Sequence, residues 1–175
     1  MRTLVNSNYK GLVVIKSTIE INTMEYLMEK YPLKYIHNPE FLTARTAAHD
    51  FHHQEHIVLG ITSGMQDEEI ELLQNFYKQY YPDTLISICK AKESETMKLF
   101  CNNFYAMKVQ IMNEFYALCQ ELNIDYDVVT QLMINNRWIN PMHTTVPGPD
   151  GKLSYGGYCF PKDTKAIVTT ADKFK

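Results

Sequence analysis

The chain has 175 residues, a hydrophobic content of 45% and a formal net charge of -3 at pH 7. This length fits one domain, or one domain with a piece of another, and the apolar content is enough for a packed core. Because the net charge is slightly negative and the Lys and Arg residues are spread out, the composition gives no electrostatic case for nucleic acid or for an acidic membrane surface as partner.

The four cysteines show no pairing pattern. Cys89, Cys101, Cys119 and Cys159 form no C-x-x-C pair and have no zinc-finger spacing. The first residues lack the apolar stretch of a signal peptide, and no apolar run approaches the length of a membrane span. We therefore expect a cytoplasmic chain with reduced thiols and no membrane partner.

The first 90 residues alternate between strand and helix patterns. The run "GLVVIKST" is apolar with a polar end, which is typical of a buried parallel strand whose carboxyl end faces a site. A helix and a second strand follow, and together they predict a βαβ unit. The predicted strands are 11–18, 33–41, 56–62 and, at "LISIC", 85–89, and the predicted helices are 21–31 and 67–81.

Helical patterns dominate the second half of the chain. Residues 94–122 contain no Gly or Pro and carry apolar residues at helical spacing, which predicts one long helix. Its wide apolar surface indicates either the centre of a helical domain or a dimer interface. A shorter helix is expected at 125–136 with Asp125 as N-cap, then a Pro- and Gly-rich loop, and a last helix from about Lys162.

These elements predict an α/β N-terminal piece, residues 1–90, with a partial parallel sheet of Rossmann type, followed by a mostly α-helical domain, residues 91–175, with one long helix. The two or three strands predicted before about residue 65 are too few for a stable parallel sheet covered on both faces. The chain also stops on a helix with no evident cap. We therefore expect a fragment, or a chain that completes its sheet with a partner.

The stretch "SYGGYCFPKDTK" places Cys159 between a glycine pair and a charged run. Gly156 and Gly157 let the backbone approach a ligand closely. A loop-to-helix junction with Lys162 nearby favours the thiolate, which is a nucleophile. A core thiol is the alternative, and it is our interpretation of the three other cysteines.

Two further patterns predict chemistry. Lys98 and Asn102 lie four residues apart in the long helix, so they share a helix face. One interpretation is a snorkelling lysine with a solvated amide. The other is a pair of polar groups that stabilises an oxyanion in a cleft. Glu40 follows Pro39 at a strand end, where α/β sheets bind ligands, although an ordinary turn carboxylate is equally compatible.

Four histidines have the spacing of one helix face: His49, His52, His53 and His56. That spacing requires a zinc site to be considered. Helical ligand pairs need a third ligand and an ordered helix, whereas this segment runs directly into a predicted strand. We expect a solvated polar loop here and no metal.

Taken together and in this order, the motifs resemble the UDP-glucose/GDP-mannose dehydrogenase family. The matching pieces span nearly the whole chain: "VVIKST", "HNPEFLTARTAAHDF", "HIVLG", "ETMKLFCNNFYAMKVQIMNE", "NNRW" and "VPGPDGKLSYGGYCFPKD". The resemblance implies that residues 1–90 are the C-terminal part of a Rossmann-like NAD-binding domain and that residues 91–175 are the central dimerisation domain. It also implies a homodimer through the long helix.

The family oxidises the primary alcohol of a nucleotide sugar to a carboxylate with two NAD in succession. By resemblance, Cys159 attacks the aldehyde intermediate to give a thiohemiacetal, and a second hydride transfer makes a thioester. Lys98 stabilises the oxyanion, with Asn102 beside it orienting the sugar, and Asp163 and Thr18 hold or activate a water. The "VPGPDGK" loop resembles the UDP-glucose enzymes of the family more than the GDP-mannose enzymes, so the resemblance implies a UDP-sugar substrate, without fixing which sugar nucleotide it is.

The remaining implied roles concern binding and acid–base chemistry. Glu40 matches the acid/base glutamate of thioester hydrolysis. The resemblance implies cofactor contacts for Ser17, Thr18 and Lys162, and substrate contacts for Glu40, Phe41, Leu42, Lys98, Asn102, Tyr155, Gly156 and Arg137, the last across the dimer.

Two departures from the family pattern stand out. Many members carry a second glutamate four residues after the first, where this chain has Ala44, and no G-x-G-x-x-G turn follows a first strand. The family's C-terminal nucleotide-binding domain has no match. We therefore weigh a non-catalytic dimerisation module as an alternative. A third hypothesis, a thiol hydrolase pairing Cys159 with His143, lacks any element in the sequence that would position His143.

Overall fold

The computed structural model describes residues 1–174. They divide into two compact units, Met1–Lys98 and a second that begins at Leu99. Helix α5 (Ala91–Glu121) contributes residues to both. The first unit holds α1 (Arg2–Asn6), β1 (Leu12–Ile15), α2 (Thr23–Lys30), β2 (Lys34–His37), α3 (Ala47–His52), β3 (His56–Ile61), α4 (Asp67–Tyr80) and β4 (Leu85–Lys90), and the second holds α6 (Tyr126–Asn135) and α7 (Cys159–Asp172).

The sheet of the first unit has four strands in the order β1-β2-β3-β4. β1 pairs with β2 in parallel, with Val14 opposite Ile36, and β3 pairs with β4 in parallel, with Leu59 opposite Ile88. Between them, β2 and β3 are antiparallel, with Ile36 opposite Ile61. The prediction of an α/β piece with a partly parallel sheet is confirmed: two of the three strand pairs are parallel, and the central pair is antiparallel.

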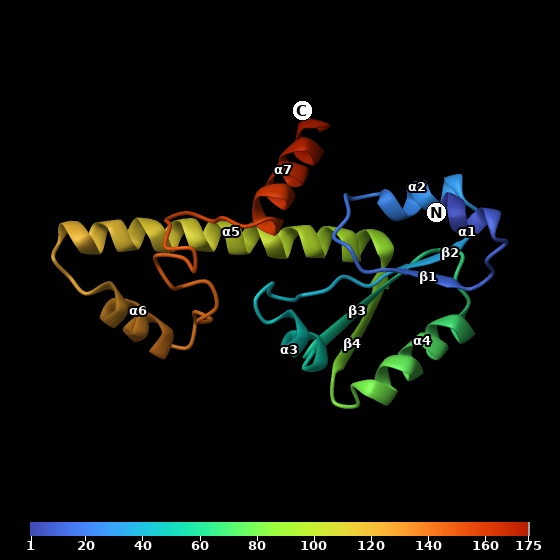
Figure 1. Ribbon diagram of the computed structural model, residues 1–175, viewed down its shortest axis with the longest axis horizontal. Helices are drawn as coiled ribbons and strands as arrows, with labels where there is room; N and C mark the ends of the chain where they lie inside the picture. Colours follow the sequence, from blue (N-terminus) through green and yellow to red (C-terminus); the bar gives the residue numbers. More distant parts are fainter. Residues whose placement is uncertain (175) are drawn as a thin grey trace. The chain divides into compact units, whose positions relative to one another are not determined.

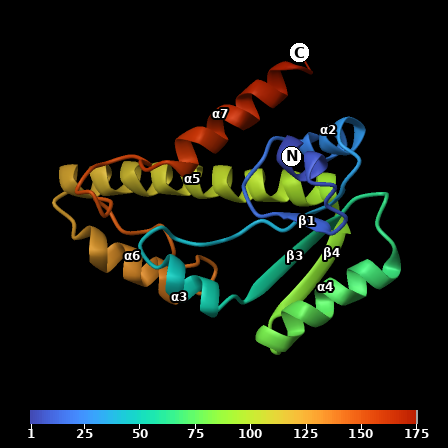
Figure 2. The same ribbon diagram turned by 45° about the vertical axis from the view of Figure 1, so that its right-hand side comes forward.

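Side chains alternate across the strands, so the sheet has an apolar core on each face. On one face Ile36, Ile57 and Leu59 pack with Tyr77 of α4. On the other, Tyr35 packs with Met24 of α2. Figures 1 and 2 show α2 on one side of the sheet and α4 on the other. Both faces are therefore covered, as buried parallel strands require.

A buried carboxylate joins the start of α2 to α5. Glu95 is 0% exposed and accepts hydrogen bonds from the backbone N–H groups of Asn22 (2.8 Å) and Met24 (2.7 Å). These N–H groups lie at the helix start, where they have no intrahelical partner. Burial raises the pKa of Glu95, and the two hydrogen bonds partly oppose that rise. Glu95 therefore fixes α2 to the first turns of α5.

The second unit is built on the long helix. Met112 and Cys119 of α5 form a small core with Tyr126 of α6 and Val146. Asp125 caps α6, because its side chain accepts hydrogen bonds from the N–H groups of residues 127 and 128. The predicted N-cap is confirmed. Figure 1 shows α6 running beside α5 and α7 starting against α5 and pointing away from it.

Several element boundaries differ from the predictions. Helix α5 begins at Ala91 and α7 at Cys159, each three residues earlier than expected. The segment predicted as a polar loop contains the short helix α3, held at its start by Asp50, whose carboxylate accepts bonds from Thr43 N and Thr46 Oγ1. Side-chain bonds of this kind leave no apolar periodicity in the sequence. Over residues 1–174, no helix is both long and apolar enough to cross a bilayer.

Candidate active site

Lys98 and the segment after β2 meet in the first unit. The Lys98 ammonium lies 4.0 Å from Glu40 Oε1 and 4.9 Å from the centroid of the Phe41 ring. The Lys98 side chain is 6% exposed and that of Glu40 is 31% exposed. A buried ammonium is costly unless anions or π-faces surround it, so this arrangement favours the functional interpretation of Lys98 over a snorkelling lysine.

The Glu40 loop is held by backbone and side-chain hydrogen bonds. Glu40 Oε2 accepts from Leu42 N at 2.6 Å, which leaves Oε1 facing Lys98. Asn38 lies two residues earlier and donates from Nδ2 to the Val58 carbonyl at 2.9 Å. The Asn38 Oδ1 atom accepts from Lys16 Nζ at 2.7 Å and from the Tyr77 hydroxyl. The "NPEFL" box is therefore anchored to β3, to Lys16 directly after β1 and to α4.

His37 lies beneath this loop and is 0% exposed. Its Nε2 is 3.3 Å from the Ser17 carbonyl oxygen, and its Nδ1 is 2.9 Å from Ser94 Oγ. Because a carbonyl oxygen only accepts, Nε2 carries the proton and Nδ1 accepts from the Ser94 hydroxyl. Burial, followed by the charges of Lys98 and Lys16, lowers the pKa of His37 to about 4, so the ring is neutral near pH 7.

A second group of predicted residues meets in the second unit. Asn102 of α5 donates from Nδ2 to Asp163 Oδ2 of α7 at 2.6 Å. Lys162 forms an ion pair with Asp163 Oδ1, and Asn103 donates to the Asp163 carbonyl at 3.2 Å. Asp163 is 1% exposed. The buried carboxylate is thus paired on both oxygens and fixes α7 to α5.

Cys159 is the first residue of α7 and is exposed. The predicted loop-to-helix junction is therefore confirmed in position. Gly157 adopts a φ of 77°, a conformation open to glycine at little cost, and this turn leads the chain into the helix. Tyr155 is half-buried, and Arg137, with a φ of 65°, is exposed directly after α6. These residues all belong to the second unit.

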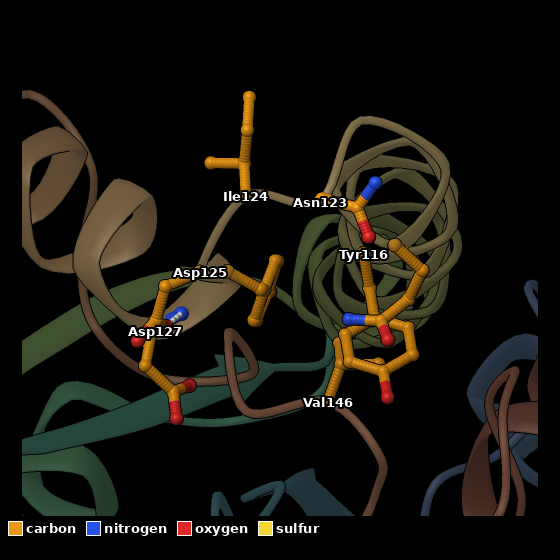
Figure 3. A pocket seen from close by; sticks show the side chains of 8 residues that line it. Tyr116, Asn123, Ile124, Asp125, Asp127 and Val146 are labelled. Atoms are coloured by element: carbon orange, nitrogen blue, oxygen red, sulfur yellow. Dashed lines mark hydrogen bonds between the residues drawn. The ribbon is translucent and has the colours of Figure 1, made fainter.

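A hollow of about 450 Å³ lies elsewhere in the second unit, between the end of α5 and the start of α6 (Figure 3). None of the predicted site residues lines it. Its lining residues are Tyr116, Gln120, Asn123, Ile124, Asp125, Tyr126, Asp127 and Val146. Within residues 1–174, no group of three or more His, Cys, Asp or Glu side chains is arranged to hold a metal ion.

Sequence reasoning missed three residues that support the predicted site, namely Lys16, His37 and Ser94. The sequence contains a pattern that could have indicated Ser94. Ser94 precedes Lys98 by four residues, the same spacing that places Lys98 and Asn102 on one helix face. His37 and Lys16 stand inside the two motifs "HNPEF" and "VVIKST". Their roles depend on the contacts between β1, β2 and α5, which periodicity alone does not reveal.

Comparison with known proteins identifies the family. Residues 2–81 match the UDP-glucose/GDP-mannose dehydrogenase family, NAD binding domain, and residues 92–175 match the central domain of the same family. The chain belongs to this family. Its relatives include the UDP-glucose 6-dehydrogenases of Rhizobium meliloti, 31% identical over 95% of this chain, and of Bacillus subtilis, 29% identical over 91%.

The fold agrees with solved structures of the same family. A UDP-glucose dehydrogenase from Pyrobaculum islandicum covers 93% of this chain with a TM-score of 0.78 at 28% identity. A UDP-D-ManNAc dehydrogenase from Pyrococcus horikoshii covers 97% with a TM-score of 0.77 at 23% identity, which supports the fold alone. The chain spans 39% of the Rhizobium relative, 36% of the Bacillus relative and 37% of the Pyrobaculum structure.

The cofactor prediction is confirmed at the level of the family, because residues 2–81 match its NAD binding domain. The residues of the first unit fit one part of this cofactor. At the carboxyl end of β1, Ser17 is exposed and Thr18 is half-buried, which leaves hydroxyl groups available as polar contacts. Residues 1–175 contain no G-x-G-x-x-G turn of the kind that cradles a pyrophosphate.

Proposed function

We propose that this chain carries catalytic groups of an NAD-dependent nucleotide-sugar dehydrogenase that oxidises the C6 alcohol of UDP-glucose to the carboxylate of UDP-glucuronate. The observation that carries the proposal is the buried Lys98 ammonium, which faces Glu40 at 4.0 Å at the carboxyl end of the sheet. A compact cation in a largely desolvated position is suited to a developing oxyanion. Family membership supports the same reaction class.

Each group has a distinct proposed role in the first unit. Lys98 stabilises negative charge on the sugar C6 oxygen, and the Phe41 ring beside it limits access of water to that charge. Glu40 acts as the acid or base of hydrolysis, with Leu42 N–H fixing one of its oxygens. Ser17 and Thr18 contact the cofactor. NAD, when bound, accepts one hydride in each of the two oxidations.

The second unit supplies the proposed covalent step. The Cys159 thiolate adds to the aldehyde carbon and forms a C–S bond, giving a thiohemiacetal. Loss of hydride from that carbon leaves a thioester, and water then cleaves the C–S bond to release the carboxylate and the thiol. Asn102 orients the sugar, and its bond to Asp163 fixes the side-chain amide for this task. Lys162, Tyr155, Gly156 and Arg137 are proposed binding residues.

A second copy of the chain is the proposed partner on α5. Seven apolar side chains recur at helical spacing along α5 and the turn that follows it, and each is at least 41% exposed. Burying such a stripe against an identical one removes apolar surface from water in both copies. We call these residues the α5 stripe: Phe100, Phe104, Met107, Ile111, Phe115, Leu118 and Leu122. The proposal includes a cytoplasmic setting, in which the thiols stay reduced.

Reconstitution tests the enzyme proposal. The chain alone should reduce little NAD with UDP-glucose, because it spans about 40% of its relatives and lacks the Gly-rich turn. Adding chains that carry the regions of a full-length relative on either side of the matched segment should restore turnover, followed by absorbance of NADH. Cys159→Ser should abolish oxidation to the acid, whereas Cys89→Ser, a matched change of a half-buried sheet thiol, should preserve it. Full turnover by Cys159→Ser would refute the covalent role.

The alternative function is a non-catalytic dimerisation module, and the exposed α5 stripe is the observation that favours it. Both proposals predict a dimer, so sedimentation alone does not separate them. Reconstitution of NAD reduction separates the two proposals. A dimeric chain that gives no NAD reduction with any supplied partner chains, although those chains bind it, would favour the module.

A further inference from the structure

The loop before α7 is attached to the helices of the second unit over residues 140–144. Lys108 of α5 donates from Nζ to two carbonyl oxygens of this loop. Tyr126 of α6 donates from its hydroxyl to the Thr144 carbonyl at 2.6 Å. Between these anchors His143 adopts a φ of 65°, a left-handed conformation that residues other than glycine rarely take. The loop is therefore held in one shape on both sides of His143.

The His143 ring lies between two other rings. Its centroid is 5.1 Å from that of Tyr105 on α5 and 5.3 Å from that of Phe160 on α7, and Tyr105 and Phe160 are themselves 6.4 Å apart. Burial, and then the Lys108 charge, lowers the pKa of His143, so the ring is neutral near pH 7 and packs as an aromatic group. The expectation that nothing positions His143 was therefore wrong.

This cluster lies directly beside the proposed nucleophile. Phe160 follows Cys159 in the first turn of α7. Figures 1 and 2 show α7 starting against α5 and then leaving it, so contacts near the start of α7 determine where Cys159 lies. Asp163, one turn further along, makes the other attachment through Asn102. Polar contacts of Asp163 with Asn102 and Asn103, together with the aromatic contact of Phe160, therefore hold this end of the helix.

We propose that His143 is a positioning residue for Cys159: its ring, packed between Tyr105 and Phe160, fixes the first turn of α7 against α5. The residue acts through Phe160, and no proton transfer is assigned to it. The proposal rests on the nucleophilic role proposed above for Cys159, but the geometry it concerns is a property of this chain alone. Its test therefore requires neither NAD nor a nucleotide sugar.

Hydrogen–deuterium exchange of the whole chain tests this proposal. The amides of residues 163–167 bond to the first-turn carbonyl groups of α7 and report on that turn. His143→Ala should speed their exchange about tenfold, because two ring contacts are lost. His143→Phe keeps both contacts and should restore the slow exchange. Amides within α6, residues 130–135, serve as the internal control and should keep their wild-type rates.

Tyr105→Leu removes the other ring that contacts His143 and should give the same local increase in amide exchange. This variant replaces His143→Ala in the experiment if His143→Ala does not fold. Unchanged exchange at residues 163–167 in both variants would overturn the proposal. An equal increase in α6 would also overturn it, because that result indicates a general loss of stability. If exchange responds as expected while the reconstituted chain does not oxidise UDP-glucose, the enzyme proposal fails and the positioning of the α7 turn stands.

Discussion

Acid should destabilise the first unit through His37. The ring is 0% exposed, and burial with two nearby lysines lowers its pKa from 6.5 to about 4. Because the folded-state pKa is the lower one, the unfolded chain binds more protons between these two values. The contribution of neutral His37 to stability is therefore complete above pH 6.5 and is lost as the pH falls toward 4.

The size of this effect follows from the gap between the two pKa values. At about 1.4 kcal/mol for each unit between the two pKa values, neutral His37 contributes at most about 3 kcal/mol to the free energy of unfolding. About 2 kcal/mol of this contribution is lost between pH 7 and pH 5. Protonation would place a third positive charge beside Lys16 and Lys98 and would remove the acceptor for the Ser94 hydroxyl. Both consequences destabilise the folded state of the first unit at low pH.

Urea unfolding followed by circular dichroism at pH 7 and pH 5 measures this difference. His37→Gln keeps a neutral hydrogen-bonding side chain at both pH values, so this variant should lose about 2 kcal/mol less than wild type over the interval. His52→Gln, a change at an exposed ring on α3, should behave as wild type. The opposing titration of buried Glu95 is present in every variant and cancels in the comparison. Equal losses in wild type and His37→Gln would refute the reasoning.

Three further predictions follow from single contacts. Asp125→Ala removes an acceptor shared by two amides at the start of α6, and the free energy of unfolding in urea should fall by about 1 kcal/mol, so an unchanged value would contradict the cap. Phe104→Glu places a charge in the α5 stripe, so this variant should sediment as a monomer at a micromolar chain concentration at which wild type is a dimer. A monomeric wild type would refute the proposed dimer. Lys98→Met keeps an apolar stem without the ammonium and should lower reconstituted UDP-glucose oxidation by about 100-fold or more, so near-normal turnover would exclude the oxyanion role.

The sequence was most informative where a pattern is local. Helix α5 carries no Gly or Pro and has helical spacing over its whole length, and its first three residues were missed because their only apolar marker is Ala91. Asp125 was identified as a cap because capping needs only a short polar side chain before an apolar run. Cys159 was placed at a loop-to-helix junction, although the helix was expected only from about Lys162, three residues after its observed start.

The rest depended on contacts that are distant in sequence. The antiparallel pairing of β2 with β3 is set by how the chain returns along the sheet through α3, and α3 itself is stabilised by Asp50 rather than by apolar spacing. The placement of His37 between Ser17 and Ser94 joins residues that are 20 and 57 positions apart. A single sequence gives periodicity along one element, whereas these bonds depend on which elements become neighbours.

One helix face carries much of the chemistry assigned to this chain. Ser94, Lys98 and Asn102 follow one another at intervals of four on α5, so each lies about one turn beyond the last. Ser94 bonds the buried His37, Lys98 faces Glu40, and Asn102 bonds the buried Asp163. His37 and Glu40 belong to the first unit, and Asp163 belongs to the second. Within the first unit, Ser94 and Lys98 lie on consecutive turns of this helix, and a helix places side chains with less positional error than a loop.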